Sequence, residues 1–125
     1  MIMLDVNNFK TINDTCGHET GDRVLVRLAQ VLKKHFRSED YICRIGGDEF
    51  VVFMINIPKE QYDLVSAKIE EITHELYESK DGLPAIMISA GIAHGSEFQD
   101  AASWFEEADE AMYRAKQRGK HAFSD

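Results

Sequence analysis

The sequence contains little cysteine and no long apolar run. Its two cysteines, Cys16 and Cys43, are too few for a disulfide framework and lack the spacing of metal ligands. The expected compartment is therefore the reducing cytoplasm. No run of about eighteen apolar residues occurs and no signal peptide precedes Met1, so we expect a soluble protein without direct membrane contact.

The sequence also lacks a basic stripe. The formal net charge is −8, which argues against a nucleic-acid polymer as the partner. A single nucleotide remains compatible with this charge, because a divalent metal ion offsets phosphate charge locally. The 125 residues, without repeats, low-complexity tracts or a linker, indicate one domain with a real core.

The apolar pattern predicts an α+β domain. Helical spacing occurs at residues 22–36, 58–77 and 100–118. Strands are predicted at residues 1–6, in a hairpin within 41–53, at 86–93 and at a short edge segment, 121–123. This β-α-β-β-α-β order with a further C-terminal helix is the ferredoxin-like, or palm, pattern of an antiparallel sheet with helices packed on it. We expect the first two helices on one face and the third on the other.

The hairpin carries the strongest local signal. Gly46 and Gly47 lie between two apolar runs, which predicts a two-residue turn. Asp48 and Glu49 place two carboxylates at its mouth, and the glycines let a ligand approach the backbone. A bare backbone beside an anionic group suits a metal–phosphate ligand, although a solvated hairpin tip has the same pattern.

Asp5 ends the first strand and is expected to lie near this hairpin. Gathered carboxylates repel one another unless a cation or a shared proton holds them. A hard, oxygen-liganded ion such as Mg²⁺ explains the cluster economically. The alternative is that Asp5 only caps the strand end.

The connector at residues 7–21 is polar, with a short helical turn expected around Phe9 and Ile12. An Asn amide and an Asp carboxylate can together read the guanine edge, but both residue types are also turn formers, and Asp22 suits a helix N-terminus. His18 fits a structural hydrogen bond better than a general base. Lysines near the last helix end complement its dipole unless they converge on one pocket.

Gly46-Gly47-Asp48-Glu49-Phe50 is the signature of a known family, and further segments follow the same pattern. These segments are residues 4–14, Gly17-His18, Gly21-Asp22, residues 108–116 and Gly119. The sequence therefore resembles the GGDEF domain of diguanylate cyclases over nearly its whole length.

The resemblance implies that two GTP molecules condense to cyclic di-GMP, one GTP being held by each domain of a homodimer. A ribose 3′-hydroxyl attacks the α-phosphate of the opposite GTP and pyrophosphate leaves. The resemblance assigns the binding of Mg²⁺ (or Mn²⁺) to Asp5, the Val6 carbonyl and Asp48, and catalysis to Asp48 and Glu49. It assigns guanine binding to Asn13 and Asp22, and phosphate binding to Phe9, Lys10, Gly46, Gly47, Lys116 and Lys120. It also implies an inhibitory product site, the RxxD motif, at Arg37 and Asp40.

The sequence departs from the family pattern in three places. Asn7 replaces an Asp found in many relatives, and Lys120-His121 replaces Arg-Asn, which removes a bidentate phosphate contact. The family's N-terminal helix, with a segment like Asp-x-Leu-Thr-Gly-Leu-x-Asn-Arg, has no counterpart here. We therefore expect the 125 residues alone to be marginally stable, to associate and to have low cyclase activity.

Two other functions remain open from the sequence. One is a non-catalytic domain that binds GTP or cyclic di-GMP and signals through a partner. The other is a palm-like, metal-dependent nucleotidyl cyclase with a different product, which shares the acids but not the Gly-Gly segment or the connector.

Overall fold

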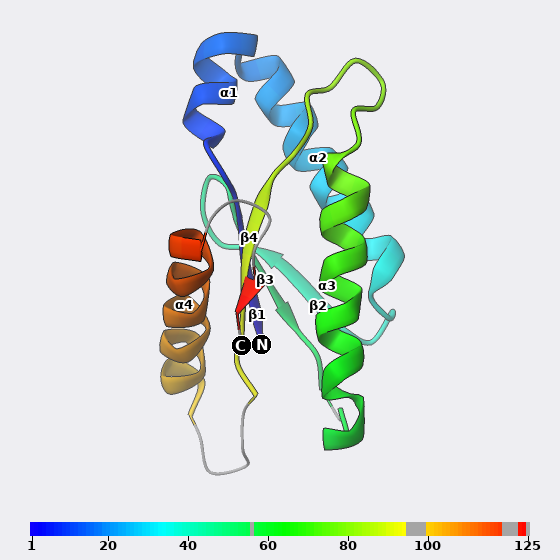
Figure 1. The fold of residues 1–125 in the computed structure, drawn as a ribbon, viewed down its shortest axis with the longest axis vertical. Coiled ribbons are helices and arrows are strands. Elements are labelled where there is room, and N and C mark those ends of the chain that lie inside the picture. Colours follow the sequence, from blue (N-terminus) through cyan, green and yellow to red (C-terminus); the bar gives the residue numbers. More distant parts are fainter. Residues whose placement is uncertain (56, 95–99, 119–122, 125) are drawn as a thin grey trace.

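A five-stranded sheet with helices on both faces organises the chain (Figure 1). The computed structural model describes residues 1–55, 57–94, 100–118 and 123–124. The elements are β1 (Ile2–Val6), α1 (Phe9–Cys16), α2 (His18–His35), β2 (Tyr41–Arg44), β3 (Glu49–Phe53), a 3-10 turn (Lys59–Gln61), α3 (Tyr62–Tyr77), β4 (Ile88–Ile92), α4 (Ala101–Arg118) and β5 (Phe123–Ser124).

The strand order is β2-β3-β1-β4-β5. β1 lies antiparallel between β3 and β4, and β5 adds a parallel edge strand to β4. This arrangement confirms the predicted α+β class, with its split β-α-β pattern and additional C-terminal helix. Within the described parts of the chain, no helix has the length and apolarity needed to cross a membrane.

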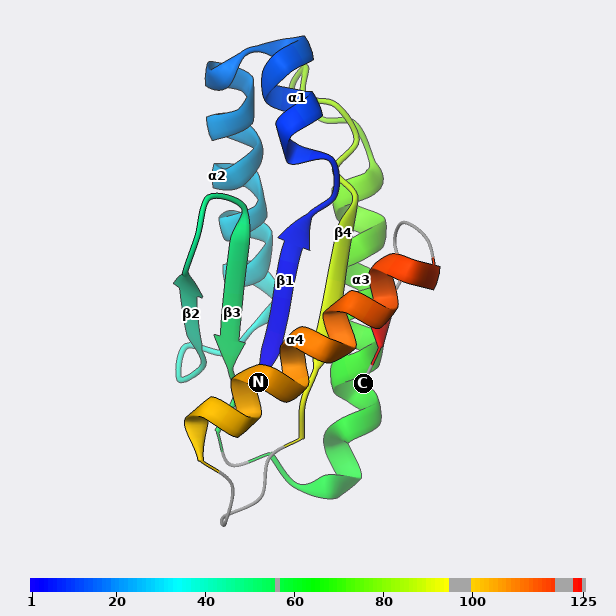
Figure 2. The same cartoon turned by 90° about the vertical axis from the view of Figure 1, so that its left-hand side faces the viewer.

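β1 is buried along its whole length, and its two faces contribute to two separate cores. Ile2, Leu4 and Val6 pack in the core that α2 and α3 cover, whereas Met3 packs in the core under α4. The alternation follows from the two-residue period of a strand. Figure 2 shows α4 crossing in front of the sheet, with α2 and α3 behind it. The predicted distribution of helices over the two faces is confirmed.

Gly91 allows α4 to approach β4 unusually closely. A Cβ atom added at Gly91 would lie 2.2 Å from the Met112 backbone nitrogen and 2.3 Å from the Ala108 carbonyl oxygen. The helix backbone therefore rests directly on the strand, as a glycine inside a strand often indicates. This contact fixes the height of α4 over the sheet, and Lys116 lies one turn beyond Met112.

The predicted two-residue turn at Gly46–Gly47 is wrong. The Ile45 amide donates to the Glu49 carbonyl at 3.0 Å, so residues 46–48 form the loop. Neither glycine has the positive φ that a primed two-residue turn requires. The longer loop lifts Asp48 out of β3, while Glu49 begins the strand.

The predicted start of the helical segment at residues 22–36 is also wrong. The connector contains a complete helix, α1, and α2 begins at His18 rather than at Asp22. Gly17 separates the two helices with φ 92°, a conformation that glycine adopts without strain. Consequently Asp22 lies in the second turn of α2 and does not cap it, and His18 belongs to the helix rather than to a loop.

The remaining boundaries shift by a few residues. The predicted strand at 86–93 is shorter, as β4, and the helix predicted from Pro58 begins with the 3-10 turn before α3. Of the predicted edge segment, only Phe123 lies within the described residues, where β5 forms.

Candidate active site

A pocket of about 570 Å³ opens where β1 ends. The residues that line it come from β1, α1, the hairpin loop, β4 and α4: Asp5, Val6, Asn7, Asn8, Phe9, Lys10, Asp48, Ser89 and Lys116. Most of the residues assigned to metal and phosphate by resemblance therefore meet in one place. Its volume is in the range of small-molecule sites.

Strand register explains why the acids meet. Asp5 is opposite Glu49 on β3 and opposite Ser89 on β4. The Val6 amide donates to the Asp48 carbonyl at 3.3 Å, which holds the hairpin loop against the end of β1. The structure thus brings Asp5, Asp48 and Glu49 to the same end of the sheet.

Asp5 is a buried acid with one unsatisfied oxygen. The residue is only 5% exposed. Its Oδ2 pairs with the Lys116 ammonium, whereas its Oδ1 is buried and has no hydrogen-bond partner in the described part of the chain. Burial raises the pKa of Asp5, Lys116 opposes that rise, and the charges of Asp48 and Asp109 add to it. A cation at this position would relieve both the burial and the repulsion.

Lys116 supplies positive charge to the acids from α4. Burial favours its neutral form, but the hydrogen bond and charge of Asp5, together with the charges of Asp48 and Glu49, raise its pKa overall. The lysine therefore remains charged at neutral pH. Its side chain is 42% exposed, which leaves the ammonium accessible to a phosphate in the pocket.

The donor set fits a divalent cation such as Mg²⁺. Asp5 Oδ1 has no hydrogen-bond partner among the described residues, and Val6 and Asp48 line the same pocket, where the Val6 amide donates to the Asp48 carbonyl. Among the described residues, no group of three or more His, Cys, Asp or Glu side chains is arranged to hold a metal by itself. Mg²⁺ is usually bound by one or two carboxylates and completed by waters and substrate phosphates, and Asp5 and Asp48 supply two carboxylates in this pocket.

The two residues assigned to guanine lie away from this lining, on the α1–α2 pair. Asn13 is on α1, and its Oδ1 would lie 1.9 Å from a Cβ added at Gly21 on α2. Asp22 directly follows Gly21 and is exposed. Gly21 is therefore the residue that lets the Asn13 carboxamide lie against α2 beside Asp22.

This contact makes Gly21→Ala a test of the guanine assignment. The new methyl group must displace the Asn13 carboxamide, and a side chain can move without unfolding the helix. We expect the KM for GTP to rise about tenfold, equivalent to roughly 1.4 kcal/mol of lost binding, while kcat changes little. Steady-state kinetics measures both constants. Ala29→Gly, also on α2 but outside this contact, is the control; an unchanged KM in Gly21→Ala would exclude guanine recognition by Asn13.

Sequence reasoning missed Arg44, Ser89 and the structural role of Asn7. Arg44 Nε and Nη2 donate to the Gly47 carbonyl, at 3.2 and 2.7 Å, so this side chain braces the hairpin loop. Ser89 Oγ donates to Asn7 Oδ1 at 2.8 Å below the pocket. A serine inside an otherwise apolar strand was an available signal for Ser89. Arg44 gave no comparable signal, because its role depends on the loop conformation.

The outcome differs among the other predicted residues. Gly46, Gly47 and Glu49 adjoin the pocket through the hairpin loop but do not line it. Lys120 lies outside the described residues.

Arg37 and Asp40 form a separate site before β2, where the Arg37 amide and guanidinium both donate to the Asp40 carboxylate, each at 2.8 Å.

The Asp40 carboxylate is fully buried beneath Arg37. Arg37 also donates to the Ile55 carbonyl at 3.0 Å, and the hydrogen bond to Asp40 raises its pKa. Here Asp40 holds Arg37 in place, and a ligand reaching this site would contact the guanidinium first.

The chain matches the family model described as diguanylate cyclase, GGDEF domain, over residues 1–122. It is 36% identical over 124 residues to the uncharacterized protein YtrP of Bacillus subtilis, covering 96% of this chain and 20% of that protein. It is 35% identical to diguanylate cyclase A of Treponema denticola, covering 97% and 33%.

Solved structures show the same fold. The GGDEF domain of DgcB from Caulobacter crescentus, in complex with c-di-GMP, superposes with a TM-score of 0.86 at 32% identity, covering 98% of this chain and 74% of that chain. This chain thus spans about a fifth to a third of the length of the curated relatives it matches.

Proposed function

Since the chain belongs to the GGDEF domain family of diguanylate cyclases, we propose that it condenses two molecules of GTP to cyclic di-GMP and two pyrophosphates. The observation that carries the proposal is the convergence of Asp5, Asp48, Lys10 and Lys116 on one pocket. Carboxylates beside lysines suit a metal–triphosphate ligand, whereas macrodipole complementation alone would not bring Lys116 onto a buried acid.

The proposed roles are those that the family resemblance implies, and the positions of several side chains support them. Lys10 and Lys116 line the pocket from α1 and α4 and bind phosphate oxygens, with the Phe9 backbone beside them. The α1–α2 pair holds guanine through Asn13 and Asp22. The hairpin glycines leave the loop backbone open to the phosphates, since a Cβ at Gly47 would meet no atom within 4 Å.

Asp5, the Val6 carbonyl and Asp48 would hold Mg²⁺ or Mn²⁺, which supplies charge neutralisation and favours ionisation of the attacking hydroxyl. In the reaction, the 3′-oxygen of one GTP forms a bond to the α-phosphorus of the other, and the bond to pyrophosphate breaks. The proton of the hydroxyl passes to the Glu49 carboxylate, because the neighbouring Asp48 carboxylate would be engaged as a metal ligand. Lys116 stabilises the negative charge that develops on the phosphate.

The proposal requires a homodimer. The described pocket, with the guanine residues proposed on the neighbouring α1–α2 pair, accounts for one GTP. Each GTP must present its hydroxyl to the other, so two domains facing each other align the reactants. GTP as substrate also agrees with a cytoplasmic location. The proposed domain spans residues 1–125.

The direct experiment is incubation of the purified chain with GTP and Mg²⁺, followed by chromatography for cyclic di-GMP. Formation of cyclic di-GMP that EDTA abolishes supports the proposal. Binding of GTP without turnover would favour a signalling domain without catalysis, and a different cyclic product would favour another nucleotidyl cyclase.

We further propose that the site of Arg37 and Asp40 binds the product, with the Arg37 guanidinium contacting the ligand and Asp40 holding it in place. Arg37 is partly exposed, and five residues (41–45) separate Asp40 from Gly46, which is the family's spacing between the motif and the signature. We expect the unsubstituted chain to bind cyclic di-GMP with a Kd on the order of micromolar. Arg37→Ala is expected to abolish this binding, because it removes a guanidinium that can donate two hydrogen bonds to phosphate or guanine. Calorimetry measures the affinity.

Ser38→Ala, in the same turn, is the control for this experiment and should bind as the unsubstituted chain does. Equal binding by Arg37→Ala, or no binding by the unsubstituted chain, would refute a product site here.

A further inference from the structure

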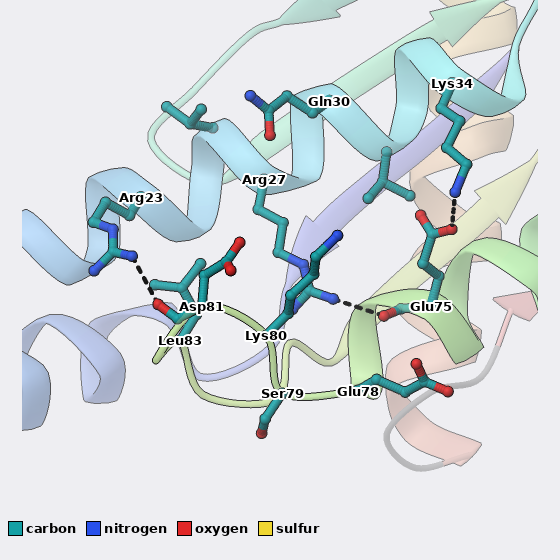
Figure 3. A pocket seen from close by; sticks show the side chains of 12 residues that line it. Arg23, Arg27, Gln30, Lys34, Glu75, Glu78, Ser79, Lys80, Asp81 and Leu83 are labelled. Atoms are coloured by element: carbon teal, nitrogen blue, oxygen red, sulfur yellow. Dashed lines mark hydrogen bonds and ion pairs between the residues drawn. The ribbon is translucent and has the colours of Figure 1, made fainter.

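A second pocket, of about 580 Å³, lies between α2 and the end of α3, on the sheet side opposite α4 (Figure 3). The residues that line it are Arg23, Val26, Arg27, Gln30, Val31, Lys34, Glu75, Glu78, Ser79, Lys80, Asp81 and Leu83. It shares no residue with the candidate active site.

Arg27 is the buried residue of this pocket whose charge has no counterion among the described residues. The residue is 9% exposed, yet its only hydrogen bond within the described chain runs from Nη2 to the Glu75 carbonyl, at 2.8 Å. Its Nη1 is buried and has no hydrogen-bond partner among the residues that the structure describes. No described carboxylate forms an ion pair with this guanidinium. The carboxylate of the neighbouring Glu75 instead pairs with Lys34 at 2.6 Å.

A buried, unpaired charge is costly, and a guanidinium carries five donors. The single bond to Glu75 would tie α2 to α3 equally well if it came from a neutral donor. The structural role alone therefore leaves the charge of Arg27 unexplained, whereas an anion in the pocket would compensate it.

Two further cations face the same pocket. Arg23 Nη2 donates to the Asp81 carbonyl at 2.9 Å and has no ion pair among the described residues. The Lys80 ammonium likewise has no hydrogen bond or ion pair within the described chain. The charges of Lys34 and Glu75 cancel within their ion pair. The other charged residues of the lining are three cations, Arg23, Arg27 and Lys80, and two exposed acids, Glu78 and Asp81. The pocket is thus positive in a chain whose net charge is −8.

We propose that this pocket binds a small organic phosphate. Its phosphoryl oxygens pair with the Arg27 guanidinium, with Arg23 and Lys80 at the entrance, and its apolar part packs on Val26, Val31 and Leu83. A phosphate dianion matches this group of three cations better than a singly charged carboxylate does.

The test uses phenyl phosphate, inorganic phosphate and benzoate as probes. Each is titrated into the ¹⁵N-labelled chain at constant ionic strength, and the amide signals of Arg27, Leu83 and neighbouring residues are followed by NMR. We expect saturable shifts at this pocket, with phenyl phosphate binding more tightly than inorganic phosphate and benzoate binding least. Lys116→Ala, which alters the candidate active site, should leave these shifts unchanged.

Arg27→Met should weaken phenyl phosphate binding roughly ten- to a hundredfold, the loss expected for charge-assisted hydrogen bonds. Lys33→Met, on the exposed face of α2 outside the pocket, is the matched control and should bind normally. If Arg27→Met fails to fold, Arg27→Lys and Lys80→Ala should each weaken binding several-fold.

Shifts that are absent, that do not saturate, or that persist equally in the substituted chains would overturn the proposal. Tighter binding of benzoate than of phenyl phosphate would indicate a carboxylate ligand and would also contradict the proposal. None of these outcomes depends on cyclase activity, so the failure of this proposal and of the proposed enzyme can be distinguished.

Discussion

Replacing Asp48 by Asn is expected to reduce formation of cyclic di-GMP by about three orders of magnitude or more. The carboxylate lines the pocket beside Asp5, on a loop that the Val6 amide holds in place. Its removal takes away a metal ligand and its charge, a change worth several kcal/mol of transition-state stabilisation, and each 1.4 kcal/mol is tenfold in rate. Asp5→Asn is expected to have a similar effect.

The measurement is the initial rate of product formation at saturating GTP and Mg²⁺. Asp48 is only half-buried and makes no described side-chain hydrogen bond, so circular dichroism and thermal melting of Asp48→Asn should match the unsubstituted chain. Asp63→Asn, an exposed acid on α3, is the matched control and should retain full activity. Near-normal turnover by Asp48→Asn would remove Asp48 from the proposed metal site.

The fold could be predicted because its determinants are local in sequence. The unbroken apolar run of β1 requires cover on both faces, and three amphipathic helices supply it. The position of Asp5 beside the hairpin acids also followed, since a strand placed antiparallel to the hairpin brings their ends together.

What could not be predicted depends on backbone conformation or on distant partners. The φ of Gly17, which begins α2 four residues early, has no unique sequence signal, because a glycine in a polar connector is equally compatible with a loop. The bracing of the hairpin loop by Arg44 depends on carbonyl directions that only the folded loop fixes.

Burial of single polar residues was equally hidden. In the sequence, Asp40 lies in a short polar segment typical of a solvent-exposed link, yet in the structure Arg37 covers its carboxylate. Arg27 lies on the helix face that the apolar pattern assigns to the core, and its spacing alone does not show that its charge is unpaired. Both features arise where segments distant in sequence meet: Arg37 against Ile55, and Arg27 against Glu75.

Gly91→Ala is expected to produce the largest loss of stability among single-methyl changes in the sheet. The added Cβ would lie within 2.3 Å of two backbone atoms of α4, the Met112 nitrogen and the Ala108 oxygen, and backbone cannot rotate away as a side chain can. The helix must therefore move off β4, which opens the core around Met3 and Val51. Overpacking of this kind costs about 1–3 kcal/mol, and more where backbone has to shift.

For a domain of this size, such a change should lower the Tm by roughly 5–15 °C. Gly47→Ala is the matched control for stability, because a Cβ at Gly47 meets no atom within 4 Å, and its Tm should stay within about 2 °C of the unsubstituted chain. Movement of α4 also withdraws Lys116 from Asp5, so GTP turnover by Gly91→Ala should fall even well below its Tm, where the chain remains folded. A Tm and a turnover rate both equal to those of the unsubstituted chain would show that α4 does not rest on β4 as closely as the contact at Gly91 requires.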